Sequence, residues 1–269
     1  MEFGICLQTV IAVRAEPSHK SEMVTQVLFG ELFRILLFDK SWVKIQLAYD
    51  DYKGWIGLNQ IQLLSEKEFL YLFNTEPAVT LELVQLISNQ SRHTVAPIIL
   101  GSSLPGFING DFKILNDQYF YDGAVTTVSP FENISTQQER LKAKHSIISD
   151  AMLYLNAPYL WGGRTPFGID CSGLVQMVYK LQKIKLFRDA SQQVTHGEPL
   201  NFVSEAEPGD LAFFDDEEGN ITHVGIMIDN SRIIHASGKV KMDTIDHEGI
   251  YDAEEQQYTH KLRILKRIV

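Results

Sequence analysis

The stretch Pro158–Lys180, PYLWGGRTPFGIDCSGLVQMVYK, decides how the second half of the chain folds. Its glycines and prolines are typical of turns, and they lead the chain to Asp170 and Cys171. The pattern beyond them predicts a helix that begins at Cys171. Free backbone N–H groups at a helix start favour a thiolate, as a nucleophilic cysteine requires, although a single cysteine is more often a small buried apolar residue. The apolar residues that recur there at helical spacing are Leu174, Val175, Val178 and Leu181.

The composition is that of a globular protein with room for two or three domains in its 269 residues. Apolar residues make up 45% of the chain and charged residues 22%, so the chain is not expected to be disordered. The formal net charge of −10 provides no basic surface for phosphate groups. Nucleic acid is therefore not expected as a partner.

The sequence contains few cysteines and shows no obvious targeting or membrane segment. The two cysteines, Cys6 and Cys171, are far apart, so neither a disulfide framework nor a cysteine-rich zinc site is expected. No stretch approaches the roughly 20 apolar residues of a membrane span. The N-terminus has an acid at Glu2 and no basic region followed by an apolar run, which argues against a signal peptide. These features predict a cytoplasmic protein, or a periplasmic or envelope protein if a leader has been removed.

Residues 1–65 are predicted to form a small β-barrel. In SWVKIQL, Trp42, Lys44 and Gln46 alternate with apolar residues, which is the period of a half-buried strand. The segments LFGELFRIL, SWVKIQ and DYKGWIG resemble those of bacterial SH3-like domains. Residues 66–134 consist of short apolar runs broken by Gly, Pro and Asn, and they predict either a second, divergent SH3-like domain or a linking β-subdomain.

Residues 135–269 are predicted to form an α+β domain, with helices first and antiparallel strands after. Residues 137–158 predict a helix that stops at Pro158, with Lys144 and His145 as a polar gap in its apolar face and Ile147 at the edge of that face. The strands are expected in LAFF, THVGIMID, RIIHASG, VKMD and LRILKRI. The residues assigned to the apolar face are Leu141, Ile148, Ala151, Met152 and Leu155.

Two histidines change the interpretation of Cys171. His223 opens the strand ITHVGIMI and His235 stands near the end of the next strand, RIIHAS, with a tight turn between them. Neighbouring antiparallel strands can bring the two imidazoles together, as a general base and its orienting partner require. A single histidine on a strand is more often structural, but two in register with a cysteine at a helix start predict a catalytic site.

These residues also carry a resemblance to a family. The segments YLWGGRTPFGIDCSGLVQMVY, EPGDLAFF and HVGIMIDNSRIIHAS resemble the successive motifs of NlpC-type cysteine peptidases, which are papain-like bacterial enzymes that cut the peptide stems of peptidoglycan. The resemblance implies that Cys171 is the nucleophile, His223 the base and His235 its orienting partner. It also implies that Tyr159 helps at the oxyanion site. No cofactor or metal is expected.

SH3-like modules before such a domain resemble the γ-D-glutamyl-L-diamino-acid endopeptidases of the dipeptidyl-peptidase VI type. The resemblance implies hydrolysis of the bond between D-Glu and the diamino acid in stem peptides with a free N-terminal L-Ala, as part of cell-wall recycling. Carboxylates must then receive the free ammonium. The implied substrate-binding residues are Glu31, Tyr52, Trp161, Asp170, Ser172 and Asp189.

Several alternatives remain open on the sequence. The enzyme could be a broader endopeptidase acting on polymeric wall, an acyltransferase with the same Cys and His, or a wall-binding module with a vestigial site. Cys171, His223 and His235 could also hold zinc without catalysis. His145, His196 and His247 lack comparable surroundings and are expected to be surface residues. Whether the third stem residue is diaminopimelate or lysine, and the oligomeric state, are left open by the sequence.

Overall fold

The structure is a computed structural model that describes residues 2–131 and 136–269. Two compact units make up the chain. The N-terminal unit is Met1–Thr127 together with Trp161–Thr165, and the C-terminal unit is Val128–Leu160 together with Pro166–Val269. Among the described residues, no helix has both the length and the apolar character needed to cross a membrane.

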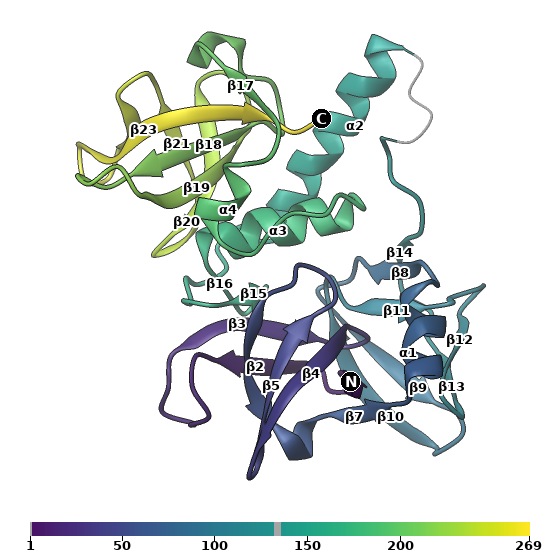
Figure 1. Cartoon of the computed structure of the whole chain (residues 1–269). Helices are drawn as coiled ribbons and strands as arrows, with labels where there is room; N and C mark the ends of the chain where they lie inside the picture. The colour runs from purple at the N-terminus through teal and green to yellow at the C-terminus, as the bar shows by residue number, and fades with distance from the viewer. Residues whose placement is uncertain (1, 132–135) are drawn as a thin grey trace. The chain divides into compact units, whose positions relative to one another are not determined.

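The N-terminal unit opens with a seven-stranded antiparallel sheet in the order β3-β2-β6-β5-β4-β1-β7 (Figure 1). The alternation predicted around Trp42 is present, because Val43, Ile45 and Leu47 are buried while the residues between them are partly exposed. The strands are β1 (Glu2–Ile5), β2 (Val10–Arg14), β3 (Met23–Leu28), β4 (Leu32–Asp39), β5 (Trp42–Leu47), β6 (Lys53–Gly57) and β7 (Gln62–Leu64), with a 3₁₀ turn, η1 (Leu58–Gln60), before β7.

A helix and two smaller sheets complete this unit. Helix α1 (Glu66–Phe73) begins with a capping box in which Ser65 Oγ accepts from the Glu68 N–H and Glu68 accepts from the Ser65 N–H. Phe69 of α1 stacks on Phe3 of β1 at 4.3 Å between ring centroids, so the helix and the first sheet share one core. The sheets are β10-β9-β13-β12 and β11-β8-β14. Their strands are β8 (Pro77–Thr80), β9 (Val84–Asn89), β10 (Thr94–Ile99), β11 (Ser103–Pro105), β12 (Asp111–Ile114), β13 (Asp117–Phe120) and β14 (Val125–Thr126).

The segment Trp161–Thr165, which includes β15 (Arg164–Thr165), packs within the N-terminal unit. Gly162 has a φ of +75°, and a Cβ at this position would lie 2.3 Å from the Met23 carbonyl oxygen. Only glycine fits so close to another backbone at this φ. Arg164 is fully buried, and its two terminal nitrogens each lie 2.9 Å from a carboxylate oxygen of Glu31.

Helices α2 and α3 pack against each other in the C-terminal unit, and α3 also packs on β19 and β20 (Figure 1). Every residue of α3 is buried, which explains its nearly continuous apolar sequence. The helices are α2 (Gln137–Met152), α3 (Cys171–Leu181) and α4 (Ala190–Gln193), with a 3₁₀ turn, η2 (Val203–Glu205), and a short strand, β16 (Gly168–Ile169), before α3.

The sheet of this unit has the order β17-β23-β18-β19-β20-β21-β22, and the further pairing of β22 with β23 closes it on itself. Six strands therefore form a closed barrel with β17 added at β23, the long yellow strand of Figure 1. The strands are β17 (Glu198–Leu200), β18 (Leu211–Asp215), β19 (Ile221–Met227), β20 (Arg232–Ser237), β21 (Lys239–Ile245), β22 (Gly249–Asp252) and β23 (Gln257–Arg267).

The predicted apolar face of α2 was only partly right, because Ala151 is fully buried as predicted but other members are not. Ile147, placed at the edge, is fully buried, whereas Leu141 and Leu155 are exposed. Lys144, taken for a gap, is buried with its ammonium 2.7 Å from Glu207 and 3.7 Å from Asp210. A buried cation is stable when paired in this way, so the buried face is centred on Ile147 and Lys144. The helix also ends at Met152, before Pro158.

The predicted domain limits stay predictions. Of the two boundaries, 65/66 falls inside the N-terminal unit, between strand β7 and helix α1. The second, 134/135, lies outside the described residues.

Candidate active site

Cys171 is the first residue of α3, as predicted. Asp170 precedes it in an extended conformation (φ −96°, ψ 177°), and its side chain accepts a hydrogen bond from the Gly173 N–H at 2.7 Å. This cap fixes the start of the helix at the cysteine. The Cys171 side chain lies against β19, where the Val224 backbone interacts with its sulfur.

Asp170 is held in a buried ion pair with Arg188. The Arg188 nitrogens Nη1 and Nη2 lie 2.9 Å and 2.5 Å from the two carboxylate oxygens, and both residues are buried. Arg188 Nη1 also donates to Ser172 Oγ at 2.9 Å. The residues on either side of the cysteine, both predicted to bind substrate, are therefore fixed by one arginine that the sequence analysis did not single out.

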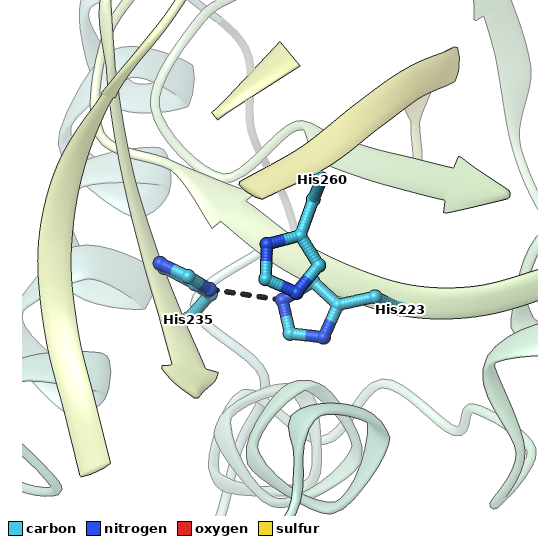
Figure 2. Close-up of side chains that lie close together, drawn as sticks. All are labelled: His223, His235 and His260. Carbon is cyan, nitrogen blue, oxygen red and sulfur yellow. Dashed lines mark hydrogen bonds between the residues drawn. The ribbon is translucent and has the colours of Figure 1, made fainter. Parts of the chain in front are cut away.

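The two histidines meet as the strand pattern predicted. His223 near the start of β19 and His235 on β20 lie with His223 Nε2 2.9 Å from His235 Nδ1 (Figure 2). Their rings are nearly perpendicular, at 86°, and both side chains are buried. The contact orients the ring of His223 with respect to β20.

Asp243 extends this line and was missed from the sequence. It lies on β21, and its Oδ2 is 2.9 Å from His235 Nε2. Burial alone would raise the pKa of Asp243, but hydrogen bonds from His235 and Lys241 outweigh burial and lower the pKa. The carboxylate therefore accepts the His235 Nε2–H. The proton between the rings then belongs to His223 Nε2, which leaves His223 Nδ1, facing away from His235 in Figure 2, as the basic nitrogen.

Burial decides the resting charge of the cysteine and the base. Burial is the main cause that raises the pKa of the Cys171 thiol to about 11, and the Asp170 charge adds to it. Burial also lowers the pKa of His223 well below its usual range, with His260 and His235 contributing. Both shifts favour a neutral thiol beside a neutral imidazole. The predicted preference for a thiolate was wrong for this resting state, because the loss of hydration outweighs the helix N-terminus.

Tyr159 lies near the cysteine. Its backbone N–H donates to the Gly238 carbonyl at 3.0 Å, which places the residue beside the end of β20. Burial raises the pKa of the Tyr159 phenol to about 12, and the charges of Cys171 and Asp170 add to that effect. The phenol therefore keeps its proton and can donate a hydrogen bond at neutral pH.

Three predicted substrate-binding residues belong to the N-terminal unit. Glu31 Oε2 accepts from the Leu28 N–H at 2.9 Å in addition to its contacts with Arg164. Tyr52 is half-buried and packs against the core of the first sheet. Trp161 is 60% exposed, and its indole N–H lies 2.5 Å from Glu22. Their contact with a substrate stays a prediction.

The remaining predicted residue, Asp189, is at the position where α4 begins. The Asp189 N–H donates to Gln192 Oε1 at 3.4 Å across the first turn. Gln193 of the same turn donates to the Ser172 carbonyl at 2.9 Å. Helix α4 is thereby tied to the start of α3.

His260 is a second residue that the sequence analysis missed. It lies on β23 with its ring stacked on His223, at 4.1 Å between centroids and 27° between planes (Figure 2). Burial, and next the charge of His235, lower the pKa of His260 to about 4. Of the histidines assigned to the surface, His145 and His247 are exposed, and His196 is half-buried against Phe187.

Two protein families match the chain at these places. The NlpC/P60 family matches residues 156–262, and the bacterial dipeptidyl-peptidase SH3 domain matches residues 13–61. The C-terminal unit carries an NlpC/P60 cysteine peptidase domain. These matches confirm the predicted resemblance to NlpC-type peptidases, the α+β fold with an SH3-like domain before it, and the assignment as a cysteine peptidase.

Relatives with both parts are known. A protein of Bacillus subtilis (strain 168) named gamma-D-glutamyl-L-lysine dipeptidyl-peptidase is 29% identical over 93% of this chain and 81% of its own length. Dipeptidyl-peptidase 6 of Lysinibacillus sphaericus is 23% identical over 91% of this chain and 92% of its own length. The crystal structure of an NlpC/P60 family protein from Bacillus cereus ATCC 10987 has the same fold, with a TM-score of 0.77 at 18% identity over 99% of both chains.

Proposed function

We propose that this NlpC/P60 peptidase hydrolyses the γ-D-glutamyl–diamino acid bond of peptidoglycan stem peptides that carry a free N-terminal L-Ala. The observations that support the chemistry are the 2.9 Å contact between His223 and His235, and the buried thiol of Cys171, which interacts with the backbone of Val224, the residue after His223. The bond is proposed from the names of the relatives that match both parts of the chain. A role in cell-wall recycling and a cytoplasmic location are parts of the same proposal.

The proposed reaction is acyl transfer through a thioester. His223 Nδ1 takes the thiol proton as the sulfur of Cys171 attacks the carbonyl carbon, and His235 with Asp243 stabilises the resulting imidazolium. His223 then protonates the leaving amine as the carbon–nitrogen bond breaks. Water, deprotonated by His223, attacks the thioester, and the thiol is released with its proton restored.

The oxyanion would receive hydrogen bonds from the Cys171 N–H at the start of α3 and from the Tyr159 hydroxyl. A single donor of this kind contributes about 3 kcal/mol to transition-state stabilisation in enzymes where it has been measured. The raised pKa of Tyr159, about 12, keeps that donor protonated through the pH range of the reaction.

Recognition of the free ammonium is proposed for the predicted carboxylates. Glu31 and Asp170 each pair with an arginine inside their own unit. Hydrogen bonds between an ammonium group and a carboxylate are stronger than neutral ones, which makes carboxylates suitable for recognising the free N-terminus. The arginines would hold the carboxylate oxygens in place, and the ammonium group of the substrate would bind to those oxygens.

The test measures cleavage of the free tripeptide, its N-acetylated form and intact wall, by the wild-type protein and by the Cys171→Ala variant. Wild type is expected to release L-Ala-γ-D-Glu from L-Ala-γ-D-Glu-L-Lys or its diaminopimelate analogue. N-acetylation of the alanine should lower kcat/KM by at least about 100-fold, because a neutral amide replaces a charged donor. Products are identified by mass spectrometry.

Controls separate the parts of the proposal. Cys171→Ala should keep the circular dichroism spectrum of the wild type and lose turnover, and retained turnover would refute the nucleophile. Equal cleavage of free and acetylated peptide would refute the free-amine requirement. Cleavage of intact wall in preference to free peptide would favour a broader endopeptidase that acts on polymeric wall.

A further inference from the structure

Three histidines lie together in the C-terminal unit, although one of them has no part in the proposed reaction. His223, His235 and His260 come from β19, β20 and β23. Each can offer one ring nitrogen so that the three nitrogens lie within 4.8 Å of one another (Figure 2). In a tetrahedral zinc site the metal–nitrogen distance is about 2.0–2.1 Å, so small side-chain movements would bring all three nitrogens to one ion.

We propose that His223, His235 and His260 form a binding site for a divalent transition-metal ion such as Zn²⁺, and that the bound ion inhibits the peptidase. The inhibition rests on the proposed function, whereas the binding does not. Imidazole nitrogens suit Zn²⁺, Cu²⁺ and Ni²⁺, while Mg²⁺ and Ca²⁺ prefer oxygen ligands.

The outer ring nitrogens already have partners that fix which nitrogens face the centre. His235 Nε2 lies 2.9 Å from Asp243, and His260 Nδ1 lies 2.9 Å from Thr259 Oγ1. His235 Nδ1 and His260 Nε2 remain for the metal, with His223 Nε2 as the third ligand. A carboxylate behind a ligating histidine is a common feature of zinc sites, and it fixes the tautomer and strengthens the ligand.

The surrounding charges also favour a cation. Asp243 lies 3.1 Å from Lys241, which in turn lies 2.5 Å from Asp252. The group therefore contains two carboxylates and one ammonium, a formal charge of −1 beside the three imidazoles. A bound dication would be partly neutralised without any further protein ligand.

Binding requires one change in the cluster. The proton that His223 Nε2 now shares with His235 Nδ1 must leave, and the ion takes its place between the two nitrogens. The ring of His260 is stacked on His223 at 4.1 Å, and its Nε2 already lies on the side of the other two nitrogens, so only small movements are needed there (Figure 2). His260 is half-buried, so its side chain has freedom that His223 and His235 lack.

The same coordination explains the inhibition. With a dication on Nε2, the His223 ring cannot accept the thiol proton at Nδ1 without placing a second positive charge beside the first. The hydrogen bond from His223 to His235 is also lost. Metal binding and general-base catalysis therefore exclude each other.

The test measures metal binding directly in the full-length protein. The affinity for Zn²⁺ is determined by competition with a chromophoric chelator, and Co²⁺ is used as a spectroscopic probe. Wild type and Cys171→Ala are expected to bind one Zn²⁺ per chain with similar affinity. His260→Phe, which keeps an aromatic ring over His223 but removes the nitrogen, should bind at least about tenfold more weakly, the effect expected even for loss of an outer partner of a ligand. Mg²⁺ should not compete.

Matched variants keep the result interpretable. His145→Ala removes an exposed histidine of α2 and should leave Zn²⁺ affinity unchanged. His260→Gln provides a second variant if His260→Phe fails to fold, and it should also weaken binding. The proposal is overturned if Cys171→Ala abolishes binding while His260→Phe preserves it, since the ion would then sit on the thiol. Failure of the folded wild type to bind Zn²⁺ would overturn it as well, whatever the peptidase assay shows.

Discussion

Asp243 shows how a single carboxylate can determine the function of two histidines. An imidazole has one donor and one acceptor nitrogen when neutral, so the acceptor at His235 Nε2 fixes the direction of the hydrogen bond from His223. Lys241 lies 3.1 Å from Asp243 and helps to keep it ionised. The basic nitrogen of His223 is therefore selected by a residue two side chains away.

Replacing Asp243 by Asn is expected to lower kcat/KM by about tenfold to 1,000-fold. An amide can accept or donate, so it no longer enforces the tautomer of His235, and it does not stabilise an imidazolium on His223 as a carboxylate does. The effect should be smaller than in a serine-peptidase triad, where the Asn variant of the aspartate loses about 10⁴-fold in kcat, because Asp243 is one residue further from the base. The measurement is steady-state hydrolysis of the tripeptide. Asp229→Asn, in the turn between β19 and β20, serves as the control and should retain wild-type kinetics. Unchanged kcat/KM in a folded Asp243→Asn protein would remove Asp243 from the mechanism.

Cys171, His223 and His235 could be predicted because each stands in a local pattern, a helix start or the end of a strand. Asp243 and His260 depend on strand register. His235 opposes Lys241, so Asp243, two residues further along β21, points to the same face. His260 of β23 opposes Ile250 of β22 next to a shift in the pairing register of these two strands. The pairing of β23 with β18 has a second register shift, beside Phe214. Each shift reverses which face a residue occupies, and no local pattern reveals it.

Helices α2 and α3 are joined by a polar contact within their packed surface. Gln182, just after α3, donates to Asp150 of α2 at 2.5 Å and accepts from Ser146 Oγ at 2.7 Å. Burial raises the pKa of Asp150 to about 6, although the hydrogen bond from Gln182 acts against it. The carboxyl group is thus one that folding makes harder to ionise.

This pKa predicts a loss of stability with rising pH. Between the unfolded pKa near 3.8 and the folded pKa of about 6, the folded chain holds the extra proton, so stability falls as pH rises through this window and the loss is complete above about pH 6. Asp150→Asn should therefore raise the free energy of unfolding at pH 7 by about 1–2 kcal/mol and have little effect at pH 4. Urea unfolding at both pH values measures this, with Asp39→Asn as an exposed control. An equal effect at pH 4 and pH 7 would contradict the assignment.

The sequence predicted the start of α2 well, but its end and its buried face poorly. Helical period locates the element, because it depends on neighbours within a few residues. Its buried face was misjudged because Lys144 was counted as polar. The pairing of that ammonium with Glu207 and Asp210 depends on residues more than 60 positions away, which an apolar pattern cannot represent.

At the scale of the whole molecule, the chain leaves the N-terminal unit and returns to it. After Thr127 it enters the C-terminal unit, and Trp161–Thr165 then packs again with the first. Arg164 of this segment is fully buried on Glu31 and also donates to the Gln26 carbonyl at 2.6 Å. Cys171 follows seven residues later. The segment Trp161–Thr165, which precedes the nucleophile in the chain, is thus held in place by a salt bridge to the SH3-like domain.

Two roles for Glu31, structural and substrate-binding, can be separated with a double variant. Glu31→Ala should destabilise the N-terminal unit by about 3–5 kcal/mol, because it leaves the Arg164 charge buried and unpaired. Glu31→Leu combined with Arg164→Met removes both charges and should restore most of that loss. All three tryptophans, Trp42, Trp55 and Trp161, lie in this unit, so their fluorescence during urea unfolding reports its stability. If Glu31 also receives the substrate ammonium, the double variant regains stability but not kcat/KM. Recovery of both would make Glu31 purely structural, and a stable Glu31→Ala protein would contradict the buried pair itself.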